Sequence, residues 1–329
     1  MNIYQVAQEA GVSIATVSRV VNGKAVVSTK TKEKVEAVLN KHNYAPSDIA
    51  RGLVLKSMRT VGVMTIDIRD IYYANVAYTV EQELSKLGYT VILCNTGEDT
   101  NEKIKYMDIL KQKKVDGIIL VGSVFKDASL DNSISAIAAK IPIVMVNGFV
   151  DCKNVYSVLC DDYDGTAQAV DYLFMQGRRK LIYFRDTDSY GARAKLEGFL
   201  SGVTKNNLKI HNNSILKVKK GLDGGCEGIE LLISRGIPFD AVVCGDDLTA
   251  IGVIKSLKDH GIKVPDQVAV TGYNNSVLSL CCDPLLTSVD SMMIDMGRNA
   301  IEIFSNVMEG EQVQSKTLIK PKLFLRKSG

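Results

Sequence analysis

Hydrophobic residues recur at helical spacing in the first ten positions of the chain. They are Ile3, Val6, Ala7 and Ala10. This i, i+3, i+4, i+7 pattern places one apolar face on a short helix over residues 3–10. Gly11 follows directly, and glycine is a common residue just past a helix end. The pattern therefore predicts a helix of about two turns, followed by a tight turn.

A second and a third amphipathic segment follow this turn. Ser13 is a favourable N-cap, and valines at 17, 20 and 21 give an apolar face to a helix over residues 14–22. Ser28 opens a third helix over residues 29–42, with apolar positions at 35, 38 and 39. Two helices joined by a short glycine turn form a helix-turn-helix pattern, and the three helices together can close one small core.

The outward side of the second helix carries groups that suit DNA. Arginine pairs with guanine edges, asparagine bonds adenine or phosphate, serine and threonine bond phosphate, and small apolar side chains meet thymine methyl groups. The alternative is a polar surface helix without a ligand. We expect DNA contacts, with Arg19 first for a guanine. The candidate residues are Ile14, Ala15, Thr16, Ser18, Arg19 and Asn22.

The stretch "NYAPSDIARGLVLKS" predicts a further short helix. Pro46 disfavours helical geometry at Ala45 and can itself open a helix, while Asp48 is favourable in a first turn. The resulting helix over residues 47–54 is marginal in water, so we expect it to order only when packed. A plain linker is the alternative.

Beyond residue 60 the pattern changes to short apolar runs, each followed by a stretch with helical spacing. Near-continuous Val, Ile and Leu strands that alternate with helices indicate parallel sheets covered on both faces. About ten such strands exceed one compact sheet, so two doubly wound α/β lobes are expected. The clearest runs span residues 61–67, 88–95, 115–122, 141–148, 180–186, 239–247 and 266–274.

Polar residues close many of these runs. Ligands of open parallel sheets sit beyond the carboxyl ends of the strands, where these side chains collect. Hydroxyl and amide groups suit polyols, sugars or nucleobases, and two tyrosines are available to stack. Any single member can instead be a local cap or turn residue. The candidates are Asp67, Tyr72, Tyr73, Asn147, Asp161, Asp246, Asp247 and Asn274.

Composition and charge place a basic head on a near-neutral body. The chain has 329 residues, of which 46% are hydrophobic and 23% are charged, an ordinary globular composition. Residues 1–59 hold nine Lys and Arg against four Asp and Glu, although the whole chain carries only +3. That asymmetry is typical of a nucleic-acid-binding module joined to another domain. Without a signal peptide or a long apolar run, we expect a cytoplasmic protein with no membrane partner.

Cysteine and histidine patterns argue against an enzyme or a metal protein. The seven cysteines are scattered and lack a Cys-x-x-Cys pair, so most are expected to be buried apolar thiols. The three histidines have no partner at metal spacing and are expected on the surface. The glycines of "GLDGGCEG" match neither dinucleotide nor P-loop patterns and suggest a helix-opening turn. We expect no cofactor, metal or catalytic residue.

The quoted motifs carry a family resemblance. "IYQVAQEAGVSIATVSRVVNG" with "VSTKTKEKVEAVLNKHNYAPSDIARGL" resembles the DNA-binding segment of the LacI/GalR family, and "ATVSRVVNG" is most similar to its catabolite control protein branch. The remaining residues resemble that family's periplasmic-binding-protein-like core. The resemblance implies a second helix in the major groove and a hinge helix whose Leu53 wedges into the minor groove.

The same resemblance implies the domain organisation. Residues 1–46 would be the helix-turn-helix domain, 47–59 the hinge helix and linker, and 60–329 the effector-binding and dimerisation core. Within that core, an N-lobe would take about 60–159 and 290–317, and a C-lobe about 160–289 and 318–329. Crossovers between the lobes are expected near residues 159–161, 289–291 and 317–319.

Two positions depart from the family pattern. Lys195 stands where sugar-responsive members usually carry an arginine that clamps the ligand, with Arg193 two residues earlier. Asn274 stands where many members have aspartate, and an amide both donates and accepts whereas a carboxylate only accepts. Catabolite control proteins also have lysine at the first position. These departures weaken a simple-sugar hypothesis.

Together these observations predict a homodimeric transcription regulator, a repressor, that binds a pseudo-palindromic operator under the control of a small-molecule effector. The alternative is control by a protein co-regulator, as in catabolite control. A sugar-binding receptor and an enzyme on a doubly wound sheet are the hypotheses from other classes. The sign of the effector's action, inducer or corepressor, stays open.

Overall fold

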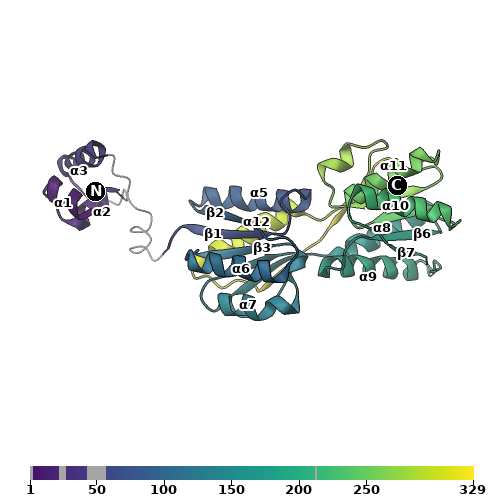
Figure 1. Cartoon of the computed structure of the whole chain (residues 1–329), viewed down its shortest axis with the longest axis horizontal. Coiled ribbons are helices and arrows are strands. Elements are labelled where there is room, and N and C mark those ends of the chain that lie inside the picture. Colours follow the sequence, from purple (N-terminus) through teal and green to yellow (C-terminus); the bar gives the residue numbers. More distant parts are fainter. Residues whose placement is uncertain (1–2, 22–26, 43–56, 212) are drawn as a thin grey trace. The chain divides into compact units, whose positions relative to one another are not determined.

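A computed structural model describes residues 3–21, 27–42, 57–211 and 213–329. The chain divides into two compact units between Arg59 and Thr60. Figure 1 draws both units. Among the described residues, no helix combines the length and apolarity needed to cross a bilayer.

The first unit is a three-helix head. Its helices are α1 (Ile3–Ala10), α2 (Ile14–Val21) and α3 (Thr29–Lys41). Ser28 caps α3 by accepting from the Thr31 amide, and Ser13 Oγ accepts from the Thr16 amide at 3.2 Å. The predicted helices, caps and core are thus present. The core residues are Val6, Ala7, Ala10, Val17 and Val35, with Val20, Val21, Val38 and Leu39 packed beside them.

The second unit holds two six-stranded sheets, one in each lobe (Figure 1). The N-lobe sheet has the order β11-β5-β4-β3-β1-β2 and is parallel throughout. The seven predicted runs all form strands. The N-lobe strands are β1 (Thr60–Thr65), β2 (Thr90–Asn95), β3 (Gly117–Val121), β4 (Ile143–Val146), β5 (Val155–Cys160) and β11 (Lys316–Ile319).

The C-lobe sheet has the order β12-β10-β9-β8-β6-β7. It is parallel except for its last strand, which pairs antiparallel with β10. Five of the twelve described strands were not among the predicted runs: the interior strands β5 and β10, and the short edge strands β7, β11 and β12. The C-lobe strands are β6 (Leu181–Arg185), β7 (Ile215–Lys217), β8 (Ala241–Cys244), β9 (Ala269–Tyr273), β10 (Thr287–Asp290) and β12 (Lys322–Phe324).

Helices cover both faces of each sheet, as the near-continuous apolar strands require. In the N-lobe, α5 packs with α12, and α6 packs with α7 (Figure 1). In the C-lobe, α8 pairs with α9 and α10 with α11. Their bounds are α5 (Ile71–Lys86), α6 (Thr100–Gln112), α7 (Ala128–Ala138), α8 (Asp162–Met175), α9 (Tyr190–Lys205), α10 (Leu222–Ser234), α11 (Asp247–Asp259) and α12 (Met293–Met308), with short 3₁₀ helices η1 (Ser123–Phe125) and η2 (Val277–Leu280).

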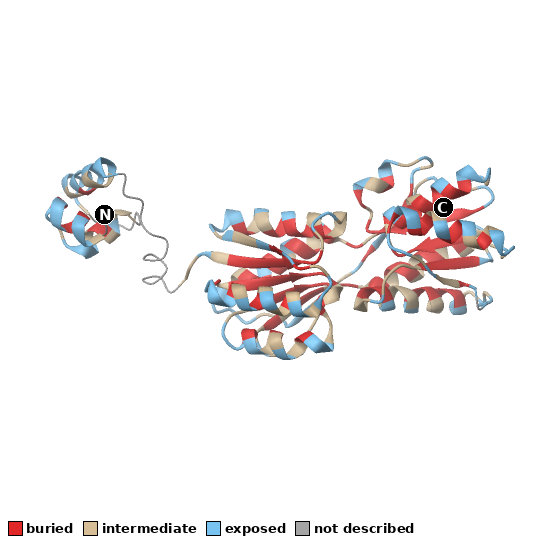
Figure 2. Cartoon of the chain, in the orientation of Figure 1, coloured by how far each residue is buried: buried red, intermediate tan, exposed pale blue. Residues whose placement is uncertain are grey.

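The alternation of side chains along β6 shows how the C-lobe core is divided. Ile182 and Phe184 pack in a cluster with α10 and α11. Leu181 and Tyr183 point to the opposite face and pack in a cluster with α8 and α9. Figure 2 shows the resulting buried sheet between more exposed helix surfaces.

Three crossovers join the lobes. The chain leaves the N-lobe between β5 and α8, returns between β10 and α12, and leaves again between β11 and β12. The C-terminal segment therefore supplies one of the two outer strands of each sheet. These crossovers bring the carboxyl ends of both sheets to one cleft.

Candidate functional site

A cleft of about 780 Å³ lies between the lobes. Loops that follow the strand carboxyl ends line it, which is where open parallel sheets bind ligands. The lining is rich in carboxylate, amide, hydroxyl and ammonium groups, with acidic and basic side chains in near balance. Such a surface offers many hydrogen bonds to a small polar molecule.

A buried polar cluster forms one wall of the cleft. Asn147 lies just after β4 with φ of 58°, a left-handed conformation that asparagine tolerates. Its amide nitrogen donates to Asp162 Oδ2 at 3.1 Å, and the Tyr273 hydroxyl donates to Asp162 Oδ1 at 2.7 Å. Asp162 is buried at the start of α8. It therefore bonds a side chain from each lobe at the first crossover.

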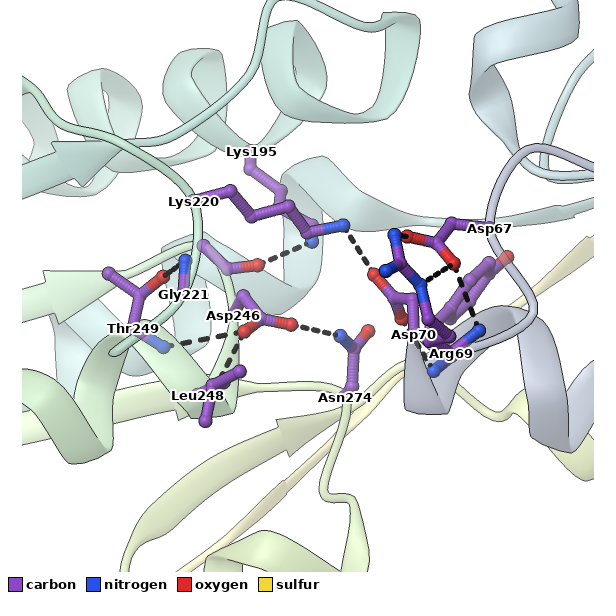
Figure 3. A network of polar contacts seen from close by, with 12 residues as sticks. Asp67, Arg69, Asp70, Lys195, Lys220, Gly221, Asp246, Leu248, Thr249 and Asn274 are labelled. Atoms are coloured by element: carbon purple, nitrogen blue, oxygen red, sulfur yellow. Dashed lines mark hydrogen bonds and ion pairs between the residues drawn. The ribbon is translucent and has the colours of Figure 1, made fainter. Parts of the chain in front are cut away.

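A second cluster surrounds Asp246, which caps α11 by accepting from the Leu248 and Thr249 amides (Figure 3). Asn274 Nδ2 donates to Asp246 Oδ2 at 3.1 Å, and Ser291 Oγ donates to Asn274 Oδ1 at 3.1 Å. Burial, and then the nearby charge of Asp186, raise the Asp246 pKa above its ordinary value. The carboxylate is therefore easier to protonate than an exposed aspartate.

The two tyrosines at the start of α5 differ in their surroundings. Tyr73 is buried against Gly122, where an added Cβ would lie 2.4 Å from the tyrosine ring. The Tyr72 hydroxyl is buried and has no hydrogen-bond partner among the described residues. Burial raises the Tyr72 pKa well above its ordinary value, so the hydroxyl keeps its proton. Tyr72 is one of the residues that line the cleft, and buried polar groups in proteins are usually hydrogen-bonded.

Lys195 is fixed against the C-lobe wall rather than extended into the cleft centre. Its ammonium group donates to the Gly245 carbonyl at 2.8 Å and lies 3.7 Å from the centroid of the Tyr273 ring. Both contacts suit a compact point charge. These two contacts fix the position of the Lys195 ammonium group at the wall of the cleft.

Seven of the ten predicted effector-site residues come together in the cleft. They are Tyr72, Tyr73, Asn147, Arg193, Lys195, Asp246 and Asn274.

Three predicted residues lie outside the cleft lining. Asp67 forms an ion pair with Arg69 at 2.8 Å, which holds its pKa at about 2. Asp161 caps α8 by accepting from the Asp164 amide at 3.0 Å. Asp247 is buried within the C-lobe. These carboxylates serve local structure, because strand ends need caps and turns as well as ligand groups.

Asp247 has a strongly altered pKa. It accepts hydrogen bonds from the Ser276 amide, the Ser276 hydroxyl at 2.8 Å and the Ser288 hydroxyl at 2.5 Å. Burial raises its pKa to about 7, although the serine hydrogen bonds act in the opposite direction. The group ties the loop after β9 to the start of α11.

Several cleft residues were not predicted. Most lie a few positions beyond the strand ends or in loops without an apolar run, whereas Asp186 closes the predicted run 180–186 and was not selected. Asp162 directly follows the predicted Asp161, and the acidic runs "DD" at 161–162 and 246–247 left the inward member ambiguous. The N-cap pattern before α5 was the available signal for Asp70. The residues are Asp70, Asp162, Asp186, Ser189, Lys220 and Ser291.

The candidate DNA-contacting face of the head is α2. Ile14, Ala15 and Arg19 are exposed, whereas Thr16 and Ser18 are half-buried. Thr16 Oγ1 shares a 2.9 Å hydrogen bond with Ser13 Oγ. The predicted positions Asn22 and Leu53, and the predicted helix over 47–54, lie outside the described residues.

The histidines are placed as expected, whereas the cysteines are less buried than predicted. Three cysteines are buried, three are half-buried and Cys281 is exposed, so complete burial is less general than predicted. All three histidines are exposed. No group of ligating side chains suited to a metal occurs within the described ranges. The glycine cluster opens α10 directly after Gly221, as predicted.

Fold and cleft define a class: a DNA-binding head joined to a two-lobed ligand-binding core. Family models agree. Residues 2–47 match the model described as "Bacterial regulatory proteins, lacI family", and residues 58–327 match "Periplasmic binding proteins and sugar binding domain of LacI family". The chain belongs to the LacI family and is a DNA-binding transcriptional regulator.

Individual relatives align over nearly the whole chain. An "HTH-type transcriptional regulator" of Lachnoclostridium phytofermentans is 41% identical, covering 100% of this chain and 99% of the relative. "Catabolite control protein A" of Priestia megaterium is 30% identical, covering 98% and 96%. A lac repressor dimer, solved with operator and the anti-inducer ONPF, has a TM-score of 0.88 at 25% identity, covering 100% and 98%.

Proposed function

We propose that this regulator is a homodimeric repressor that binds a pseudo-palindromic operator and responds to a neutral polyhydroxylated effector, a sugar or a sugar-like molecule, in the interlobe cleft. The observation that carries the effector assignment is the cleft itself. It joins amide, carboxylate and hydroxyl groups of both lobes around a volume of about 780 Å³, which is ample for a small ligand.

Charge balance favours a neutral ligand. Cationic and acidic side chains line the cleft in similar numbers, and many of them are already paired. Asn147 and Asn274 offer both donors and acceptors to ligand hydroxyls. The description of the matched family model as a sugar binding domain supports the same class.

For DNA, we assign the contacts to the exposed face of α2. Arg19 is the candidate guanine contact, with Ile14 and Ala15 beside it for thymine methyl groups. We also assign Thr16, Ser18 and Asn22 to this face, and Leu53 of the hinge to the minor groove. Residues 1–46 would then form the head, 47–59 the hinge and 60–329 the core.

Exposed apolar side chains support the dimer. Tyr78 of α5 is 66% exposed and Leu93 of β2 is 47% exposed in the N-lobe, and Val277 and Leu280 of η2 are exposed in the C-lobe. A second copy of the chain would cover such residues. We place the regulator in the cytoplasm, where its operator DNA is, and assign it no catalytic activity.

A thermal-shift screen of the full chain tests the effector assignment. The panel holds neutral sugars, sugar phosphates and nucleobases, and we expect stabilisation by at least one neutral sugar. Each ligand that stabilises the protein is then added to an operator-binding assay on a duplex selected from a random library. A panel without a stabilising compound would remove the effector assignment and shift weight to a protein co-regulator.

A further inference from the structure

One ion pair links the two lobes at the edge of the cleft. Asp70 lies at the start of α5 in the N-lobe, and Lys220 directly precedes the α10 cap in the C-lobe. The Lys220 ammonium donates to Asp70 Oδ2 (Figure 3). The Lys220 side chain is 44% exposed and that of Asp70 is 17% exposed. Solvent therefore screens this pair only in part.

The Asp70 carboxylate has two separate functions. Its Oδ1 accepts from the Tyr72 amide at 2.8 Å and caps α5, which leaves Oδ2 for Lys220. Partial burial alone would lower the Lys220 pKa. The charge and hydrogen bond of the Asp70 carboxylate have the larger effect, so the Lys220 pKa is raised above its ordinary value. The lysine is therefore charged near neutral pH, and the contact between the lobes is electrostatic.

On the C-lobe side, hydrogen bonds continue from the pair into the effector cleft. The Gly221 amide donates to Thr249 Oγ1 at 3.1 Å, and the Thr249 amide donates to Asp246 Oδ1 at 3.4 Å. Asp246 is bonded to Asn274, and Asn274 to Ser291, which lies on the crossover between β10 and α12. The chain of contacts thus runs from α5 through the cleft wall to Asn274 (Figure 3). From Asn274 it continues to Ser291 on the crossover.

Lys220 also lies 5.7 Å from the centroid of the Tyr73 ring, and Asn147 donates across the lobes to the buried Asp162 carboxylate at 3.1 Å. Two further contacts between the lobes are neutral. Ser123 Oγ donates to Ser189 Oγ at 3.0 Å, and the Phe149 and Tyr190 rings meet edge to face at 5.4 Å. The other ion pairs described in the core join residues of a single lobe. An electrostatic link at the cleft edge can therefore be removed without disturbing these neutral contacts.

We propose that Asp70 and Lys220 form a latch that sets the resting balance between open and closed lobes, and through it the response to effector. The proposal rests on the effector cleft assigned above. Because the hydrogen bonds beyond Lys220 include Asp246 and Asn274, a ligand bound to those two residues acts on the same network as the latch. A half-exposed ion pair shifts such an equilibrium by a few-fold, enough to tune a response without fixing it.

Disulfide trapping of the full chain measures closure directly. Ser123→Cys with Ser189→Cys replaces the 3.0 Å hydroxyl contact by a thiol pair that can cross-link only when the lobes are closed. A fixed concentration of a mild oxidant takes up the two protons and two electrons that the thiols lose, and the rate of cross-linking then reports the closed fraction. Peptide mapping separates this disulfide from any that the native cysteines form. Neither DNA nor effector is present in this assay.

Two latch variants are introduced into the trapping background, with one matched control. Lys220→Met removes the cation, and Asp70→Asn removes the charge while its amide oxygen still caps α5. Lys219→Met is the control, because Lys219 is 73% exposed and pairs with Glu227 of its own lobe at 2.7 Å. The double variant Asp70→Asn/Lys220→Met completes a double-mutant cycle.

We expect each single latch variant to cross-link about 2- to 5-fold more slowly than the parent, the protein with only the two introduced cysteines. The double variant should be no slower than the single variants, and the Lys219→Met control should cross-link at the parental rate. High salt should slow the parent toward the variants and leave the variants unchanged. Trapping of Lys220→Met at the parental rate, or additive losses in the double variant, would overturn the latch. Either result leaves the proposed function intact, because that function depends on operator binding and the ligand panel.

Discussion

The head and the cleft use polar side chains in opposite ways. On α2 the candidate ligand groups stand outward from a small apolar core, and Arg19 is held by no described partner. In the cleft, Asp162, Asn274 and Lys195 are already bonded to other parts of the core. A free surface side chain affects only its ligand, whereas a bonded one also affects stability and lobe position. Substitutions in the two regions should therefore differ in kind.

The largest expected effect is on DNA. Arg19→Ala should strongly reduce discrimination between operator and random duplex, weakening operator binding about 10- to 100-fold, because a bidentate guanine contact contributes roughly 1–3 kcal/mol. Gel-shift titration at fixed salt measures this. Lys34→Ala, an exposed charge on α3, is the control for general electrostatics. Unchanged operator specificity would remove Arg19 from the contact face.

The next effect concerns stability of the core. Asp247 has a folded-state pKa of about 7, raised above the unfolded value, so its folded form binds more protons. Its contribution to stability is present below about pH 4 and is lost as the pH rises toward 7. Urea unfolding from pH 5 to 8 should show this loss, roughly 1–3 kcal/mol in total. In Asp247→Asn this pH dependence of the unfolding free energy should be absent. If the unfolding free energy falls equally with pH in both proteins, Asp247 is not the group responsible.

A cleft substitution should combine both kinds of effect. Asn274→Asp places a second carboxylate beside Asp246, where an amide now donates at 3.1 Å. We expect a loss of about 1–2 kcal/mol in unfolding free energy near pH 7, recovered as the pH falls, together with altered ligand preference in the thermal-shift panel. DNA binding by the head should change less than in Arg19→Ala. A variant with altered ligand preference but unchanged unfolding free energy would contradict the difference drawn between the head and the cleft.

The smallest expected effect is at Tyr72. Removing its hydroxyl in Tyr72→Phe should leave unfolding free energy within about 1 kcal/mol, because no described residue accepts from it. Affinity for a sugar found in the panel should fall by up to about 10-fold. Isothermal titration of both proteins measures the affinities. Equal affinities would place the ligand away from this hydroxyl.

Sequence patterns predicted the parts of the fold that local spacing decides. The helices of the head followed from the 3.6-residue period, and seven strands followed from continuous apolar runs. The outer strands β7, β11 and β12 escaped prediction because they are only three or four residues long and partly exposed. Their strand conformation depends on pairing with a neighbour that is remote in sequence.

The sequence predicted where the cleft lies but not all of the residues that line it. Strand ends identified Asn147, Asp246 and Asn274, since those positions follow directly from an apolar run. Lys220 was missed because its role depends on Asp70, which is 150 positions away in the chain. Asp67 was included because a carboxylate after a strand suits a turn as well as a ligand, and here it pairs with Arg69. Contacts between distant segments settle such choices.

The last two strands have a consequence for synthesis of the protein. The N-lobe sheet gains its outer strand from Lys316–Ile319, and one of its faces is covered by α12, whose Phe304 is fully buried in the N-lobe core. Because a chain emerges from the ribosome N-terminus first, the N-lobe cannot finish folding until almost the whole protein has been made. The head, complete within the first forty or so residues, can close its core and bind DNA on its own schedule. A truncated or stalled chain would therefore carry a folded head beside an unfinished effector core.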